Sequence, residues 1–156
     1  MKNKNLKRMV VAVSWLSALA APVMASAHES GVRSLGYGAA ATDFYQVSCY
    51  DDGNGPADYL EVQLLDLAPK PTPDPVISIQ VIKGIKASNA TDLGDGDAKP
   101  SPALRLHGGN GTYLVTVNKT RMGKETYQFS YHCVTDALHG NAHTGTSEPL
   151  PVAQNQ

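Results

Sequence analysis

The sequence predicts an all-β protein, an antiparallel β-sandwich that follows a cleaved N-terminal signal peptide. Apolar side chains recur at every second position in several short segments, as in strands with one buried face. Segments rich in Gly, Asn and Asp separate them, and these residues favour turns. No amphipathic helix of useful length is apparent in the sequence. Short strands separated by regular turns are typical of a β-sandwich.

Five segments carry the alternating pattern most clearly. We expect strands at residues 44–50, 59–67, 76–83, 112–118 and 125–134. Turn-rich segments at 108–111 and 121–124 flank the fourth strand, so we expect the fourth and fifth to be consecutive antiparallel strands. In the fifth, the alternation places Tyr127, Phe129, Tyr131 and Cys133 on one face and Thr126, Gln128, Ser130 and His132 on the other.

The N-terminus has the three parts of a signal peptide. Basic residues and no acidic ones precede an apolar run at 9–25, which ends in the small residues Ala25-Ser26-Ala27. This run is shorter than the roughly 20 residues of a membrane-spanning helix. We therefore expect cleavage after Ala27, with Ala25 as the alternative site, and export to the periplasm or the cell exterior. No membrane insertion is expected after cleavage.

The remaining residues are enough for a single domain. We expect a β-sandwich at 28–136 and a polar C-terminal tail or loop at 137–156. Residues 1–27 carry four of the thirteen basic residues and none of the fourteen acidic ones, so cleavage changes the formal net charge from −1 to −5. A moderately acidic surface argues against nucleic acid as a partner.

The two cysteines, Cys49 and Cys133, are expected to form a disulfide bond. An even number of cysteines in an exported protein favours pairing, because export leads to an oxidising compartment. One cysteine lies in an early predicted strand and the other in a late one. The disulfide would therefore connect distant parts of the chain.

The arrangement of Cys49, Tyr131 and Cys133 resembles that of an immunoglobulin-like domain over residues 40–135. Tyr131 stands two residues before the second cysteine, as in the tyrosine corner of such domains. The resemblance implies a sandwich in which Tyr131 is buried with its hydroxyl bonded to backbone, and it implies no particular function. Two departures are the lack of a tryptophan after Cys49 and of an obvious strand after Cys133.

Histidines suggest a metal site. All five lie after residue 27, and cleavage after Ala27 would give His28 a free amine beside its imidazole ring. An amine and an imidazole on one residue can chelate Cu(II), which favours nitrogen ligands. This resembles the histidine brace of exported copper proteins. We expect further imidazole ligands from His132, His139 or His143. The alternative is that these histidines are solvated surface residues.

Aspartates in a Gly-rich loop suggest calcium as an alternative metal. Asp92, Asp95 and Asp97 offer oxygen ligands, which Ca²⁺ prefers, although their spacing does not match an EF-hand. Runs of Asp and Gly are also ordinary in turns.

The sequence leaves three functions open. The first is an exported metal-binding protein, with copper as the favoured ion. The second is a structural or adhesive module that binds another exported protein without a metal. The third is a copper monooxygenase-like enzyme using the same brace. No nucleophile elbow or phosphate-binding loop is present in the sequence, and we expect no enzymatic activity.

Overall fold

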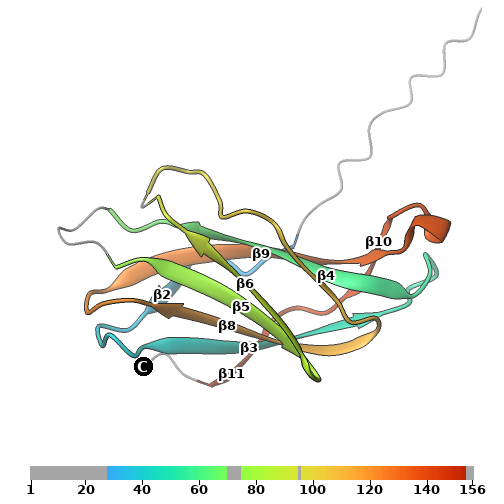
Figure 1. Cartoon of the computed structure of the whole chain (residues 1–156), viewed down its shortest axis with the longest axis horizontal. Helices are drawn as coiled ribbons and strands as arrows, with labels where there is room; N and C mark the ends of the chain where they lie inside the picture. The colour runs from blue at the N-terminus through green and yellow to red at the C-terminus, as the bar shows by residue number, and fades with distance from the viewer. Residues whose placement is uncertain (1–27, 70–74, 95, 154–156) are drawn as a thin grey trace, which may run out of the picture.

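The computed structural model describes residues 28–69, 75–94 and 96–153, which form an all-β protein (Figure 1). The predicted signal peptide and Asp95 lie outside the described residues. Among those described, no helix is long and apolar enough to cross a membrane. The strands are β1 (His28–Glu29), β2 (Arg33–Leu35), β3 (Thr42–Tyr50), β4 (Ala57–Asp66), β5 (Ile77–Lys83), β6 (Lys86–Asp92), β7 (Leu104–His107), β8 (Gly111–Lys119), β9 (Glu125–Thr135), β10 (His143–Thr146) and β11 (Leu150–Ala153).

These strands form one antiparallel sheet with the order β6-β5-β8-β3-β10-β9-β4-β7, with β1 and β2 paired to β9 and β11 paired to β3. Short β10 joins the two halves, because Gly145 and Thr146 pair with β3 whereas His143 and Thr144 pair with β9. The two ends of the sheet also approach each other, since Lys86 at the start of β6 donates from Nζ to the carbonyl of His107 in β7. The sheet is therefore nearly closed into a barrel.

The core forms where the predicted alternation places apolar side chains. The inner-face residues of β9 are fully buried, whereas Thr126, Gln128, Ser130 and His132 are partly exposed. Strands β4 and β5 follow the same rule. Their buried side chains include Leu60, Val62, Leu64, Ile77, Ile79 and Val81. The five segments predicted to be strands therefore correspond to β3, β4, β5, β8 and β9.

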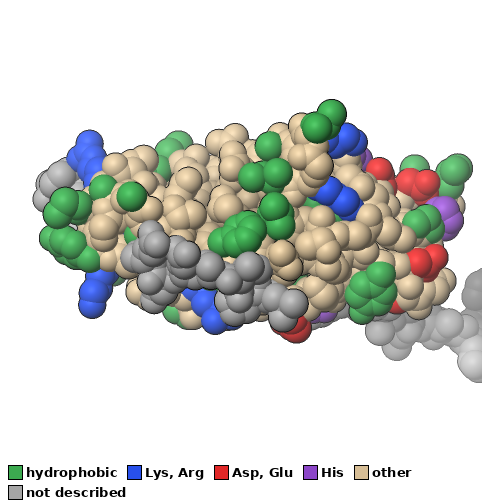
Figure 2. Space-filling model, turned by 90° about the horizontal axis from the view of Figure 1, so that it is seen from below, with side chains coloured by type: hydrophobic (Ala, Val, Ile, Leu, Met, Phe, Trp, Pro, Cys, Tyr) green, Lys and Arg blue, Asp and Glu red, His purple; other side chains and the backbone are tan. Residues whose placement is uncertain are grey.

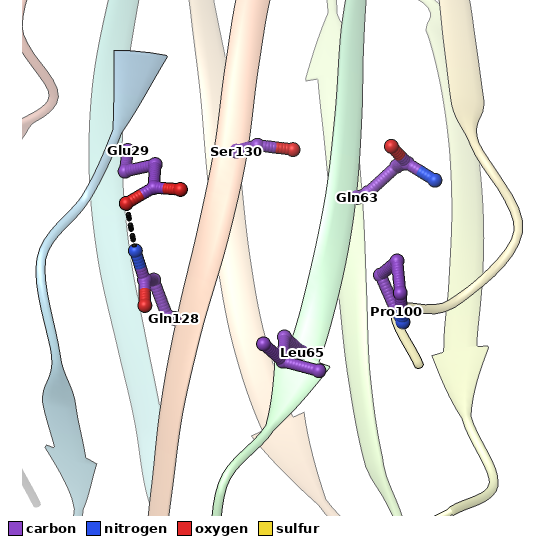
Figure 3. A pocket seen from close by; sticks show the side chains of 6 residues that line it. All are labelled: Glu29, Gln63, Leu65, Pro100, Gln128 and Ser130. Carbon is purple, nitrogen blue, oxygen red and sulfur yellow. Dashed lines mark hydrogen bonds between the residues drawn. The ribbon is translucent and has the colours of Figure 1, made fainter. Parts of the chain in front are cut away.

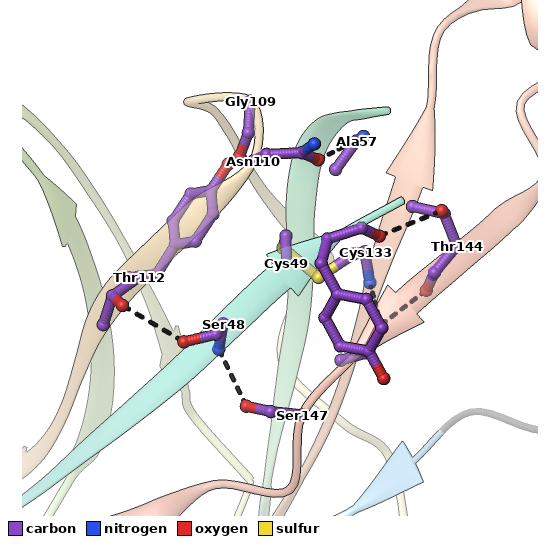
Figure 4. Close-up of a disulfide and its surroundings, with 12 residues drawn as sticks. Ser48, Cys49, Ala57, Gly109, Asn110, Thr112, Cys133, Thr144 and Ser147 are labelled. Carbon is purple, nitrogen blue, oxygen red and sulfur yellow. Dashed lines mark hydrogen bonds between the residues drawn. A yellow bond between two sulfur atoms is a disulfide. The ribbon is translucent and has the colours of Figure 1, made fainter. Parts of the chain in front are cut away.

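The predicted disulfide bond is confirmed. Cys49 near the end of β3 and Cys133 near the end of β9 are bonded, with their Cα atoms 5.7 Å apart. Figure 4 shows the bond close to Thr144 of β10, which connects the same two strands through hydrogen bonds. The two halves of the sheet are thus joined covalently near the point where β10 bridges them.

The expected pairing of the fourth and fifth predicted strands is wrong. Although β8 and β9 follow each other in the chain, β8 pairs with β3 and β5, whereas β9 pairs with β4. The connection between them crosses from one half of the sheet to the other. Turn residues show that the chain reverses direction, but they do not determine which strand becomes the neighbour.

The C-terminal segment is more regular than the tail or loop predicted for residues 137–156. After a short 3-10 helix, η1 (Ala137–His139), it forms β10 and β11. Both pair with β3, and β10 also pairs with β9. Their sequences, HTGT and LPVA, are only four residues long, so they are too short to show an alternation that would predict strands.

Tyr131 is buried as expected, but its hydrogen-bond partner differs from the expected one. Its hydroxyl donates to Oε2 of Glu148, at 2.9 Å, rather than to backbone. The partner comes from the segment between β10 and β11, which the sequence did not predict to pack here. Burial and this bond raise the pKa of Tyr131 above its usual range.

Candidate functional site

His132 lies on the outer face of β9 and is the best enclosed of the candidate ligands. Its side chain is 14% exposed, and its Nε2 lies 3.1 Å from Oε1 of Glu61 on the neighbouring strand β4. Burial and the nearby His143 lower the pKa of His132, although Glu61 opposes this effect. Among the described residues, Nδ1 of His132 is buried without a hydrogen-bond partner.

His143 begins β10 and lies against His132. The two imidazole rings are stacked, with their centroids 4.3 Å apart and their planes 23° from parallel. The contact arises because β10 pairs with β9, which places His143 opposite Val134, two residues beyond His132. Of the imidazoles predicted as partners for His28, two are thus in direct contact.

His28 forms the first position of β1 at the edge of β9. It pairs with Tyr131 and its ring stacks on that of Tyr131, with centroids 5.6 Å apart. The residue opposite it, Tyr131, immediately precedes His132 in β9. The charge of His28 also acts on His132 and contributes to lowering its pKa. His28 is therefore near the histidine pair, although its ring now packs elsewhere.

His139, the remaining predicted ligand, makes other contacts. Its Nδ1 lies 2.6 Å from Oδ1 of Asp136, and its ring covers Gly55 in the loop between β3 and β4. The glycines that follow it break any helix that could place His139 and His143 on one face. His139 therefore lies apart from the stacked pair of His132 and His143 in its contacts.

Glu61 and Arg105 belong to the site although the sequence analysis did not single them out. The β4–β9 register places Glu61 opposite His132, and the β4–β7 register places it opposite Arg105. Arg105 forms an ion pair with Oε2 of Glu61, while His132 contacts Oε1. The alternation of residues 59–67 already placed Glu61 on an outer face, but only the strand pairing shows what lies opposite.

Acidic side chains and a histidine gather at one end of the molecule, where β10 and η1 lie (Figure 2). The residues there are connected by contacts, because Thr144 donates to Oδ1 of Asp52 and His139 covers Gly55. Asp136 belongs to the same end through its contact with His139. Negative charge close to His143 would raise the local concentration of cations.

Within the described part of the chain, no group of three or more His, Cys, Asp or Glu side chains has the geometry of a metal site. The stacked pair His132 and His143 supplies two imidazoles. A third nitrogen would have to come from a group other than these side chains, such as the amine that cleavage after Ala27 would create.

In the acidic loop predicted as a calcium site, Asp92 and Asp97 form hydrogen bonds to backbone. Asp92 is buried, with Oδ2 accepting from the backbone of Asp66 and Oδ1 from that of Gly94. Oδ1 of the exposed Asp97 accepts from the backbone of Lys99. Asp92 and Asp97 therefore each accept hydrogen bonds from backbone N–H groups in this part of the fold.

A shallow pocket lies on the same outer sheet face, farther along β9 and β4 (Figure 3). In it, the carboxylate of Glu29 accepts a hydrogen bond from Gln128. Its lining consists of Glu29, Gln63, Leu65, Pro100, Gln128 and Ser130. Gln63 lies two residues after Glu61 in β4, and Ser130 lies two residues before His132 in β9. The pocket therefore continues the row of polar side chains that contains His132.

Comparison with known proteins finds no matching family model, no matching curated sequence and no matching solved structure. Any assignment of function therefore depends on the chemistry of the residues described above.

Proposed function

We propose that this chain is an exported metal-binding protein that holds a Cu(II)-type ion at His132 and His143, with the N-terminal amine of His28 as a further ligand. The observation that carries the proposal is the buried Nδ1 of His132, which has no hydrogen-bond partner among the described residues and lies in a ring stacked on a second imidazole. An unpaired buried polar atom costs free energy, and a bound cation would remove that cost.

The position of β1 supports the participation of His28. His28 pairs with Tyr131, the residue that precedes His132 in β9. A free amine there would bring the number of nitrogen ligands to three without counting the His28 ring, and Cu(II) favours such nitrogen sites. Because His143 is only half-buried at the start of a short strand, its ring can turn from the stacked position toward an ion.

We also propose that the fold is an immunoglobulin-like sandwich. In it, the two halves joined by Cys49–Cys133 correspond to the two layers. The disulfide is the feature that supports this interpretation.

A copper titration of the protein beginning at His28 tests the function. We expect one Cu(II) per chain by calorimetry, and at least a tenfold loss of affinity in His132→Ala and in His143→Ala. Binding should weaken as the pH falls through about 6.5, because imidazole ligands must be deprotonated. Electron paramagnetic resonance would report nitrogen ligation directly.

His107→Ala is the matched control. This histidine is exposed and its Nδ1 contacts Oδ2 of Asp58 at 2.9 Å, so its removal should leave copper affinity unchanged. An extra glycine before His28 removes the free amine from that residue and should weaken binding. If the extended protein binds as tightly as the native start, His28 is not a ligand. If His132→Ala and His107→Ala behave alike, the proposed site is wrong.

A binding module without a metal is the second candidate, and the pocket beside Gln63 and Ser130 is the observation that favours it. Amide, hydroxyl and carboxylate groups around an apolar floor suit a neutral polar ligand or a loop of another exported protein. The copper titration separates the two functions. Correctly processed protein that binds no copper would leave the pocket as the candidate site.

A further inference from the structure

Glu61 lies between two bases on the outer face of the sheet. One carboxylate oxygen forms the ion pair with Nε of Arg105, and the other lies 3.1 Å from Nε2 of His132. The side chain is 14% exposed, so the carboxylate is held largely away from water. Both neighbours are fixed by strand register, which places Arg105 and His132 on opposite sides of Glu61.

The hydrogen-bonding chemistry of Arg105 and Glu61 determines which nitrogen of His132 carries the proton. An ionised carboxylate only accepts hydrogen bonds, and an arginine only donates them. Nε2 of His132 must therefore donate to Glu61. In a neutral imidazole the other nitrogen, Nδ1, then has a free lone pair, and this is the atom without a partner among the described residues.

We propose that Glu61 is a positioning residue, held by Arg105, that keeps His132 in the tautomer whose Nδ1 faces the metal ion. The inference rests on the proposed function and names the ligating nitrogen of that site. Metal-bound histidines commonly donate their other ring N–H to a carboxylate, which fixes the ring and makes it a stronger ligand. Glu61 would act through His132 without contacting the ion itself.

Glu61→Gln is the decisive variant because Arg105 remains donor-only. Arg105 will take the oxygen of the new amide, and the amide NH₂ will then face Nε2 of His132. That nitrogen must become an acceptor, so the proton moves to Nδ1 and blocks the lone pair. We expect ¹⁵N chemical shifts of His132 in the metal-free protein to report the Nε2–H tautomer in the wild type and the Nδ1–H tautomer in Glu61→Gln.

Copper binding should change with the tautomer. We expect Glu61→Gln to lower Cu(II) affinity about 10- to 100-fold, the usual effect of losing such a partner. The nitrogen hyperfine pattern in electron paramagnetic resonance should change as well. Asp58→Asn is the matched control, because it makes the same change of charge on β4 beside another histidine, His107 of β7. It should leave both copper affinity and the His132 tautomer unaltered.

The outcomes separate this inference from the proposed function. If the wild type binds copper and Glu61→Gln binds it equally well with the same spectrum, Glu61 does not position His132, although the metal site stands. If wild-type His132 is found with its proton on Nδ1, the inference is overturned even if the variant does not fold. If no form binds copper while the tautomer is as expected, the proposed function fails instead.

Discussion

Tyr113 shows how a single buried side chain makes the stability of the protein depend on pH. The residue is fully buried, its hydroxyl donates to the carbonyl of Gly109 at 2.8 Å, and the ammonium of Lys83 lies over its ring. Burial raises the pKa of Tyr113 to about 12. Tyr45, Tyr127 and Tyr131 also have raised pKa values, with burial as the main cause.

We therefore predict a loss of stability in alkali. In the unfolded chain a tyrosine ionises near pH 10, whereas in the folded protein Tyr113 keeps its proton until about pH 12. The unfolded state thus binds fewer protons between these values, and the free energy of unfolding falls as the pH rises through this window. Thermal unfolding at pH 9, 10 and 11 should show a falling midpoint, with additional phenolate absorbance appearing on unfolding. A midpoint independent of pH would contradict the prediction.

At the scale of the elements, β10 depends on a close approach that only glycine permits. Gly145 pairs with Tyr50 of β3, and a Cβ atom built on it would lie 2.7 Å from the backbone oxygen of Tyr50 and 2.4 Å from its ring. The ring can turn away, but the backbone oxygen belongs to the strand itself. A larger residue would therefore push β10 away from β3.

Gly145→Ala is predicted to destabilise the protein by about 1–3 kcal/mol, the usual cost of overpacking a close contact. Chemical denaturation monitored by circular dichroism would measure the change. Gly38→Ala is the control, because a Cβ at Gly38 meets nothing within 4 Å, and it should leave stability nearly unchanged. Equal stability of the two variants would show that β10 does not need the close approach.

The sequence predicted the elements whose own residues carry the signal. Strands such as β4 and β9 bury every second side chain along most of their length, and that alternation is visible without knowing the neighbours. By contrast, β6 has the sequence KASNATD and β10 the sequence HTGT, and both are strands because they pair with β5 and with β3 and β9, respectively. Pairing with a distant segment leaves no mark in such short, polar sequences.

The candidate site was predictable to the same degree. His28, His132 and His143 were identified by residue type, and the outer position of His132 followed from alternation. Glu61 could not be identified, because its contact with His132 depends on the register between β4 and β9. That register is set by packing across the whole core, which a linear pattern does not contain.

At the scale of the whole molecule, the two ends of the described chain attach to the two strands that the disulfide connects. Near the N-terminal end, β1 and β2 pair with β9, and near the C-terminal end, β11 pairs with β3. Cys133 and Cys49 bond these two strands to each other, at a sequence separation of 84 residues. Most of the core lies within the loop that this bond closes.

A mechanical load applied between the chain ends would therefore bypass most of the core. Tension would detach β1, β2, β10 and β11 and pull β3 away as far as Cys49 before it acts on the bond between Cys49 and Cys133, while the residues between the cysteines stay unstretched. Reduction of the bond would release roughly 280 Å of additional chain, at about 3.3 Å per residue. Single-molecule stretching with and without reductant should show this difference in length.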